Sequence, residues 1–449
     1  MATQFILSIT GLSMFVLLSG CTASSKYPLA ESYGPQPVLP EPQSALLPTV
    51  NIAPAKGWPK GKMPIPAEGL KVQAFAQGLE HPRWLYVLPN GDVLVAETDA
   101  PPKPDDSKGI RGKIMKMVMR RAGSSFPSAN RIRLLRDTNG DGVADQNTVF
   151  LQNLNSPFGM ALVGNMLYVA NTDALLRFPY QEGATQITAK GTKVLDLPAG
   201  KLNHHWTKNV VANPEGSKLY ITVGSNSNAA ENGLDKEVGR ALILEFDIAS
   251  AQARPFATGL RNPNGMAWQP QSGKLWTVVN ERDELGSDLV PDYMTSVREG
   301  GFYGWPYSYY GQHVDTRVKP QNPAMVARAL KPDYALGNHT ASLGLAFYAA
   351  ELMPQYRGGA LIGQHGSWNR KPYSGYKVVF VPFRNGQPYG KPQDVLTGFL
   401  SDKGQALGRP VGVAIDFSGA VLVADDVGGM IWRVSPVGQT TYESPMQRR

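Results

Sequence analysis

The sequence has one cysteine, six histidines and few patterns with the period of a helix. Each of these shortages limits the fold or the chemistry that the chain can have. Because Cys21 is the only cysteine among 449 residues, the chain can form no internal disulfide. The formal net charge is +8, yet the sequence has no run of lysine and arginine with interleaved aromatic residues. Nucleic acid is therefore a poor candidate for the partner. The positive balance suits an anionic cofactor or an anionic membrane surface better.

A strand-turn-strand sequence pattern recurs along the chain and predicts the fold. In its first copy, over residues 79–97, an apolar strand leads through a turn of Pro, Asn, Gly and Asp into a second apolar strand. Five further copies follow, at residues 154–170, 210–224, 259–278, 343–363 and 408–425. One such unit cannot bury its faces alone, whereas a ring of neighbouring units can. We therefore predict an all-β fold, a six-bladed β-propeller over residues 68–436.

The first residues have the features of a targeting segment. An uncharged apolar run over residues 5–18 is too short for a comfortable membrane span, and it leads into Leu-Ser-Gly-Cys at Cys21. This motif matches a bacterial lipobox, so residues 1–20 are predicted to be a lipoprotein signal peptide and Cys21 to be lipidated. No basic residue precedes the run, and an ordinary signal peptide or an uncleaved anchor are the alternatives. Thr22 favours an outer-membrane lipoprotein that faces the periplasm.

Residues 21–67 are rich in proline, serine and alanine and have no sustained period of either kind. Repeated prolines prevent regular structure and favour extended, solvated backbone. We expect this segment to be a tether between the lipid anchor and the propeller. Residues 437–449 are expected to be a polar C-terminal tail.

Two adjacent histidines, His204 and His205, stand where the inner strand of the third unit begins. Neighbouring strand residues point to opposite faces, so one imidazole can face a pocket while the other supports it. Arg261 and Arg409 occupy the corresponding place in the fourth and sixth units, and all these strand starts are expected to converge on one mouth of the central channel. The alternative is a pair of polar residues that only closes a loop.

Two acidic stretches are candidates for binding metal. In the first, Asp137, Asn139, Asp141 and Asp145 place oxygen ligands at alternating positions around glycine turns, as calcium requires. The spacing lacks the final glutamate of an EF-hand, and a tight polar turn without an ion is the alternative. The second stretch, residues 281–292, is dense in carboxylates and follows the fourth unit; surface solvation is its other interpretation.

Taken together and in order, several segments resemble the pyrroloquinoline quinone (PQQ)-dependent soluble sugar dehydrogenases. These segments are His205, Arg261-Asn262-Pro263-Asn264-Gly265, residues 300–306 and residues 343–348. Residues 280–283, 291–293 and 363–370 look most like the sorbosone dehydrogenase branch of that family. The resemblance covers nearly all of the chain after the tether.

The resemblance implies that the chain oxidises a sugar or a sugar-derived aldehyde, of aldose, pyranose or sorbosone type, by hydride transfer to PQQ. His205 matches the general base of the family. Arg261 and Asn262 match residues that bind the quinone and stabilise the negative charge that develops on its oxygen. Backbone carbonyls near Arg282 and Asp283 match the ligands of a calcium ion that bridges the cofactor to the protein.

The resemblance also implies further contacts with the cofactor. Arg409 matches an arginine that pairs with a cofactor carboxylate, and Thr340 is expected to contribute from the fifth unit. Arg370 or Lys371 is expected to replace a lysine of the family, while Val411 stands where the family has a second arginine. The expected partners are a sugar and an unidentified electron acceptor.

Two other functions suit the same fold. A calcium-dependent lactonase or esterase would need inward metal ligands, for which Glu97, Asn171 and Asn262 are candidates. A propeller that only binds a partner is the other possibility, because the fold does not fix the function.

Overall fold

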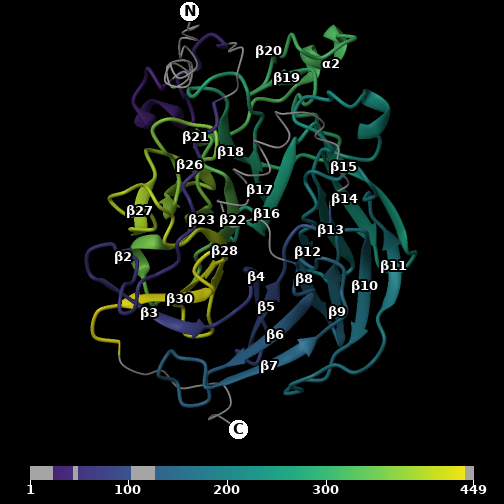
Figure 1. The fold of residues 1–449 in the computed structure, drawn as a ribbon. Coiled ribbons are helices and arrows are strands. Elements are labelled where there is room, and N and C mark those ends of the chain that lie inside the picture. The colour runs from purple at the N-terminus through teal and green to yellow at the C-terminus, as the bar shows by residue number, and fades with distance from the viewer. Residues whose placement is uncertain (1–23, 44–48, 103–126, 440–449) are drawn as a thin grey trace, which may run out of the picture.

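Six antiparallel sheets surround one central axis, so the predicted six-bladed β-propeller is confirmed (Figure 1). The computed structural model describes residues 24–43, 49–102 and 127–439. Within each blade, the strands follow the order of the chain from the axis outward. Blade 6 is the exception, because its outermost strand comes from near the N-terminus. The four main strands of each blade, from the axis outward, are: in blade 1, β4 (Pro82–Val87), β5 (Val93–Glu97), β6 (Arg131–Arg136) and β7 (Gln146–Leu151); in blade 2, β8 (Met160–Val163), β9 (Met166–Ala170), β10 (Ala174–Pro179) and β11 (Thr192–Asp196); in blade 3, β12 (Val210–Ala212), β13 (Lys218–Val223), β14 (Leu242–Asp247) and β15 (Gln252–Thr258); in blade 4, β16 (Asn262–Trp268), β17 (Leu275–Asn280), β18 (Pro291–Ser296) and β21 (Tyr334–Asn338); in blade 5, β22 (Ser342–Phe347), β23 (Ala360–Gln364), β24 (Lys377–Val381) and β27 (Gln393–Thr397); and in blade 6, β28 (Pro410–Ile415), β29 (Val421–Asp425), β30 (Met430–Pro436) and β3 (Leu70–Gln77).

Blade 6 closes the ring because it joins the two ends of the folded chain. Strand β3 pairs antiparallel with β30, from Leu70 opposite Pro436 to Gln77 opposite Met430. The first strand after the N-terminal segment therefore forms the outer edge of the last blade, so that the two ends of the propeller hold each other in place.

Glycines on the inner strands allow neighbouring blades to approach closely at the axis. A Cβ added to Gly159 would lie 2.3 Å from the backbone nitrogen of Val210 in the next blade. The same addition to Gly344 would lie 2.3 Å from the carbonyl oxygen of Val411. Contacts this short do not exist in real structures, so only glycine fits. The repeated glycine in the first strand of these units is explained by this packing around the channel.

The N-terminal segment is not the solvated tether that the sequence predicts. Its short strand β1 (Tyr33–Gly34) extends blade 4 by pairing with β21, and β2 (Ile65–Pro66) extends blade 5 by pairing with β27. Between them, isolated bridges join Asn51 to Asn369 and Ala55 to Ala406. The expectation of a solvated backbone is therefore wrong at these paired positions. Proline excludes regular structure, but it does not prevent edge pairing and side-chain burial.

The first prediction concerns the anchor of this segment, Trp58. Its ring packs edge-on against Phe399 and Trp432 at centroid distances of 5.5 and 5.4 Å, and its Nε1 donates to Asp425 Oδ2 at 2.6 Å. We expect Trp58→Ala to lower the free energy of unfolding by about 2–4 kcal/mol, because a partly buried aromatic side chain is removed. Denaturant unfolding measures the change, with the half-exposed Met63→Ala as the control. A Trp58→Ala effect no larger than that of the control would show that the segment is not anchored there.

Three expectations from the sequence concern regions at the margins of the fold. Cys21, the signal peptide of residues 1–20 and residues 440–449 lie outside the described residues. In the part of the chain that the structure describes, no helix has the length and apolar character needed to cross a membrane. The candidate calcium loop of residues 137–145 lies between β6 and β7, and thus in the first blade.

Candidate functional site

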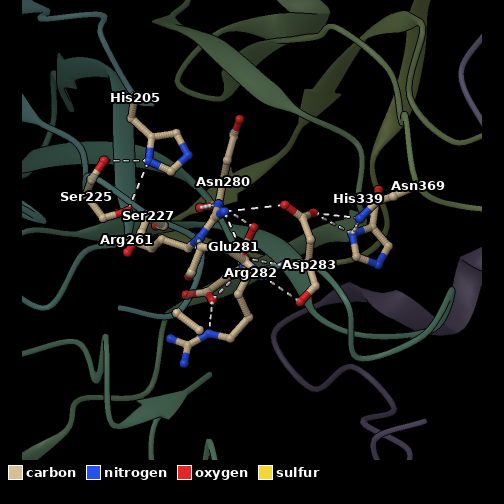
Figure 2. A network of polar contacts seen from close by, with 12 residues as sticks. His205, Ser225, Ser227, Arg261, Asn280, Glu281, Arg282, Asp283, His339 and Asn369 are labelled. Carbon is tan, nitrogen blue, oxygen red and sulfur yellow. Dashed lines mark hydrogen bonds and ion pairs between the residues drawn. The ribbon is translucent and has the colours of Figure 1, made fainter. Parts of the chain in front are cut away.

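His205 lies in a bend just before β12, at the end of blade 3 where the inner strand begins. Its Nδ1 lies 2.8 Å from the carbonyl oxygen of Ser225 and 3.0 Å from the hydroxyl of the same residue (Figure 2). A carbonyl oxygen can only accept a hydrogen bond, so Nδ1 carries the proton and Nε2 of the neutral imidazole carries the lone pair. The ring is therefore held in a tautomer that can accept a proton at Nε2.

The two neighbouring histidines have different environments. His204 is exposed and His205 is half-buried. Both stand in a bend, so the strand alternation expected from the sequence does not apply to this pair. Of the two, His205 makes the contact with Ser225 that fixes its tautomer.

A fully buried lysine supports the loop that carries His205. Lys208 Nζ donates to the carbonyl oxygen of Trp206 at 3.1 Å and to that of His205 at 3.5 Å. Burial, together with the positive charge of Arg240, lowers the pKa of Lys208 to about 7. Next to it, Asn209 Nδ2 donates to the carbonyl oxygen of Asn264 in blade 4. These bonds fix the loop against its neighbours, which a precisely placed base requires.

Gly224, at the end of β13, brings Asn262 close to His205. A Cβ at residue 224 would lie 2.5 Å from Asn262 Oδ1 and 2.5 Å from the Cβ of His205. Both side chains thus lie against a position where no side chain is present. The Oδ1 atom of Asn262 is buried and has no hydrogen-bond partner, and neither side-chain atom of the fully buried Asn226 has one. Buried polar atoms are normally paired, so the Oδ1 of Asn262 beside His205 is available to a polar ligand.

Arg261 is a buried cation that joins blades 3 and 4. Its Nε donates to the carbonyl oxygen of Asn228 at 3.1 Å, its Nη1 to that of Glu281 at 2.7 Å, and its Nη2 to the carboxylate of Asp283 at 3.3 Å. Figure 2 shows the guanidinium between the His205 side of this network and the side that contains His339 and Asn369. With its donors engaged in this way, Arg261 supplies a fixed positive charge beside Asn262.

Asp283 is the centre of the second half of the network. Its Oδ1 accepts from Asn369 Nδ2 at 2.6 Å and lies 3.6 Å from His339 Nδ1. Burial raises the pKa of this carboxyl, but the hydrogen bond from His339 and the charge of Arg261 outweigh burial and hold the pKa below its usual value. The pKa of His339 is raised in turn: burial opposes its charge, and the bond to Asp283 more than compensates. Asp283 is therefore an anion paired on two sides.

The expected calcium ligands near the cofactor have other partners. The carbonyl oxygen of Asp283 accepts from Arg317 Nη1 at 2.9 Å and from Asn228 Nδ2 at 3.2 Å. The fully buried side chain of Arg282 pairs with Glu281 and Asp315. Among the described residues, no group of three or more His, Cys, Asp or Glu side chains is arranged to hold a metal ion.

The acidic loop of blade 1 uses its oxygens on its own backbone. Asp137 accepts from the backbone nitrogens of Gly140 and Gly142, both at 2.7 Å. Asn139 Oδ1 accepts from the nitrogen of Asp141, and Asp145 Oδ2 from the nitrogen of Thr138. These bonds are those of a polar turn that holds itself together, the alternative to a second calcium site.

The residues of the fifth unit that were expected to bind the cofactor do not all face a ligand: two of them form hydrogen bonds with other parts of the protein. Arg370 donates to the carbonyl oxygens of Ser287 and Pro372 and to the hydroxyl of Ser25, and thereby fastens the N-terminal segment. The side chain of Lys371 is exposed. The hydroxyl of Thr340 is fully buried and donates to the carboxylate of Asp292 at 3.2 Å. The structure therefore does not bring Thr340, Arg370 or Lys371 into the network around Arg261.

Arg409, in contrast, lies directly before the inner strand β28 with few partners. Its Nη2 donates to the carbonyl oxygen of Ala53 at 2.9 Å, and its guanidinium carbon lies 4.9 Å from the centre of the Tyr376 ring. The side chain is buried, and its Nε has no hydrogen-bond partner. It forms no ion pair with any residue in the described ranges. This environment leaves the predicted role in binding an anion open to Arg409.

The metal ligands considered for a lactonase have different environments. The carboxylate of Glu97 accepts from Arg131 and Arg133, so two cations already neutralise it. Asn171 Oδ1 is buried without a partner, like Asn262 Oδ1. Because Glu97 is paired in this way, the carboxylate that such a site needs is not available.

The sequence interpretation did not select three residues at the same end of the propeller. Arg83 pairs with Asp426 at 2.6 Å, and His365 Nε2 lies 2.9 Å from the same carboxylate. The available signal was position: Arg83 is at the start of the first unit as Arg261 is at the start of the fourth. The other two residues follow directly after second strands, β23 and β29.

Comparisons with known proteins show which families and proteins the chain is similar to. Residues 165–367 match the family described as Glucose / Sorbosone dehydrogenase, and residues 311–437 match the TrAA12-like family. The chain is similar to aldose sugar dehydrogenase YliI of Escherichia coli, with 26% identity over 56% of this chain and 66% of that protein. It is 22% identical to the PQQ-dependent pyranose dehydrogenase of Coprinopsis cinerea over 70% of this chain and 44% of that protein.

Solved structures share the fold over most of their length. The holo form of the PQQ domain of pyranose dehydrogenase from Coprinopsis cinerea superimposes with a TM-score of 0.66 and 20% identity, covering 86% of this chain and 100% of that one. A Trichoderma reesei enzyme of carbohydrate-active family AA12 gives a TM-score of 0.67, also at 20% identity, covering 86% and 98% of the two chains. At this identity, the likeness shows the fold.

Proposed function

We propose that the chain, which is similar to PQQ-dependent sugar dehydrogenases in sequence and in fold, oxidises a sugar or a sugar-derived aldehyde with bound PQQ. The observation that carries this proposal is the buried Oδ1 of Asn262, which has no partner and lies close to His205, with the cationic Arg261 next to it in the chain. This oxygen can accept a hydrogen bond from a polar ligand, and the guanidinium of Arg261 favours negative charge on that ligand. When bound, PQQ supplies the carbonyl group that accepts a hydride.

His205 is the residue that would hold the substrate proton. Its Nδ1 proton is committed to Ser225, so Nε2 accepts the proton of the sugar hydroxyl, or of the hydrated aldehyde. Lys208 holds the loop in position by donating to the carbonyl oxygen of Trp206. As the imidazole becomes positively charged, the carbonyl oxygen of Ser225 continues to accept from Nδ1 and favours the charged ring.

Arg261 and Asn262 would bind and orient the cofactor. The guanidinium is already fixed by blades 3 and 4, so it stabilises negative charge nearby without rearranging. The amide of Asn262, the first residue of β16, supplies a hydrogen-bond partner. Arg409 would pair with a carboxylate on the far side of the mouth, where its own partners leave Nε unused.

Calcium is proposed together with PQQ at the carbonyls of Arg282 and Asp283. Among the similar solved structures is a calcium form of the Trichoderma reesei family AA12 enzyme. In this chain, the carbonyl oxygen of Asp283 already accepts from Arg317 and Asn228, so an ion there would have to displace these donors. No step of the reaction described above depends on the ion.

Steady-state dye reduction tests the proposed activity. Purified protein is supplied with PQQ, with calcium or a chelator, and aldoses and sugar-derived aldehydes are compared as substrates. We expect dye reduction only when PQQ is present and a sugar or aldehyde is added. Equal rates without PQQ, or hydrolysis of lactones in place of dye reduction, would contradict the proposal.

We also propose that the protein is held in the bacterial envelope by a lipid on Cys21. The lipobox before Cys21 motivates this location, and residues 24–43 show how the chain continues from there onto blade 4. We expect Cys21→Ser to release the protein from the membrane fraction or to block its processing. Fractionation followed by immunoblotting measures this, with Ser25→Ala as a control that keeps the cysteine. A Cys21→Ser protein that stays with the membranes as the parent does would refute the anchor.

A further inference from the structure

A second ionic cluster lies at the same end of the propeller, on blades 1, 5 and 6. It contains Arg83 from β4, His365 directly after β23 and Asp426 directly after β29. Arg83 Nη1 donates to Asp426 Oδ2 at 2.6 Å, and His365 Nε2 lies 2.9 Å from that oxygen and 3.1 Å from Oδ1. The functions assigned above to His205, Arg261 and Asn262 do not use this cluster.

The cluster adjoins the proposed active site through one aromatic ring. The guanidinium carbon of Arg83 lies 5.8 Å from the centre of the Trp206 ring, and Trp206 follows His205 in the chain. The strand packing gives the same placement, because the carbonyl oxygen of Arg83 lies against Gly412, three residues after Arg409. Arg83 therefore lies between the loop of the general base and the inner strand that begins after Arg409.

The cluster combines two cations with two carboxylates. Arg83 and Arg409 bring positive charges that both act on His365. Beside Asp426 lies the fully buried Asp425, whose Oδ1 accepts from the backbone nitrogen of Arg409 at 2.8 Å. Burial lowers the pKa of His365 to about 4 despite its bond to Asp426, so its ring is neutral near pH 7. Arg409 is only 3% exposed and has no ion pair within the described residues. A buried guanidinium that no carboxylate of the described residues contacts is costly, so this position is suited to an anion.

Unused donors point to the same conclusion. Both Arg83 Nε and Arg409 Nε are buried, and neither has a hydrogen-bond partner. Guanidinium N–H groups form charge-assisted hydrogen bonds with carboxylates, so two unused groups of this kind favour a carboxylate ligand.

We propose that Arg83 and Arg409 form a carboxylate-binding subsite, which Asp426 and His365 hold in place. The inference rests on the proposed function, since it locates one carboxylate of a ligand bound at this mouth. Arg83 would thus supply the second cation that is missing at Val411, in place of the fifth-blade residues Arg370 and Lys371. The carboxylate could come from the cofactor or from an acidic sugar, and the experiment separates these sources.

Calorimetric titration of PQQ, glucuronate and glucose into the full folded protein tests the subsite. The variant is Arg83→Gln, and the matched control is Arg136→Gln, which removes an arginine with a similarly small exposed side chain from its pair with Asp92 at the other end of blade 1. If the cofactor supplies the carboxylate, Arg83→Gln weakens PQQ binding roughly ten- to hundredfold, the usual loss of a charge-assisted hydrogen bond, while the control does not. If the substrate supplies it, glucuronate binding weakens by a similar factor while PQQ and glucose binding stay unchanged.

Unchanged binding of both PQQ and glucuronate to Arg83→Gln would overturn the subsite. An equal loss in Arg136→Gln would also overturn it, because the effect would then come from the stability of blade 1. Failure of the parent protein to bind PQQ would refute the proposed function instead, and the glucuronate titration would then decide the subsite alone. Partial recovery of the lost affinity in Arg83→Lys is expected, since lysine restores the charge without the guanidinium geometry.

Discussion

Replacing His205 with alanine is expected to lower the turnover number about 10²–10⁴-fold, the usual contribution of a positioned general base. The imidazole is the only group of the loop before β12 whose tautomer the structure fixes for accepting a proton, through the bond between Nδ1 and Ser225. Cofactor binding should remain, because Arg261, Asn262 and Arg409 come from other blades. Single-turnover reduction of bound PQQ by sugar measures the chemical step separately from later electron transfer.

The neighbouring histidine supplies the control for this experiment. His204 is exposed, so His204→Ala should leave the chemical step within a few-fold of the parent. Near-normal turnover in His205→Ala, with the loss appearing in His204→Ala, would show that the base has been assigned to the wrong residue. A second control, Ser225→Ala, removes the hydroxyl but keeps the backbone carbonyl oxygen, and it should have only a small effect on turnover.

Adding one methyl group at Gly224 should reduce turnover about a hundredfold. The new Cβ would lie 2.5 Å from both Asn262 Oδ1 and His205 Cβ, so both side chains would have to move. A misplacement of about 1 Å can cost a factor of this size in catalysis. The free energy of unfolding should fall by only about 1–3 kcal/mol, as for other overpacked sites. Steady-state kinetics and thermal unfolding of Gly224→Ala measure the two effects.

Gly191→Ala separates this local effect from general overpacking. Its Cβ would lie 2.5 Å from the ring of Phe178, before β11 at the outer edge of blade 2. It should lose stability to a similar extent while keeping its turnover number. Parent-like turnover in Gly224→Ala, or an equal loss in Gly191→Ala, would mean that the contact between Gly224, His205 and Asn262 does not control catalysis.

The fold could be predicted from the sequence because the strand-turn-strand pattern of each blade has a direct physical cause. Alternating apolar residues and polar turns define the inner two strands of each blade, and the glycines at positions such as 159 and 344 mark close contact between blades. The positions of His205, Arg261 and Arg409 followed from the repeat, since each precedes or begins an inner strand. The order of strands in a repeat thus gave the location of a site as well as the fold.

The parts that the sequence could not give depend on long-range packing. Proline content suggested a solvated tether, but edge pairing of β1 and β2 depends on the outer strands of blades 4 and 5. Arg370 looked suited to bind a cofactor, yet Ser25, more than three hundred residues away, accepts from its guanidinium. The Arg83–Asp426–His365 cluster joins three blades, and no local pattern connects those residues.

A calorimetric titration of PQQ into the parent protein and into Asn262→Ala tests the central claim most directly. We expect the parent protein to bind one PQQ per chain. Asn262→Ala should bind PQQ more weakly, because the substitution removes the buried amide oxygen that has no partner within the protein. Asn213→Ala, on an exposed turn of blade 3, serves as the control and should bind as the parent does. Absence of PQQ binding by the folded parent protein, or equal binding by the parent and Asn262→Ala, would contradict the account.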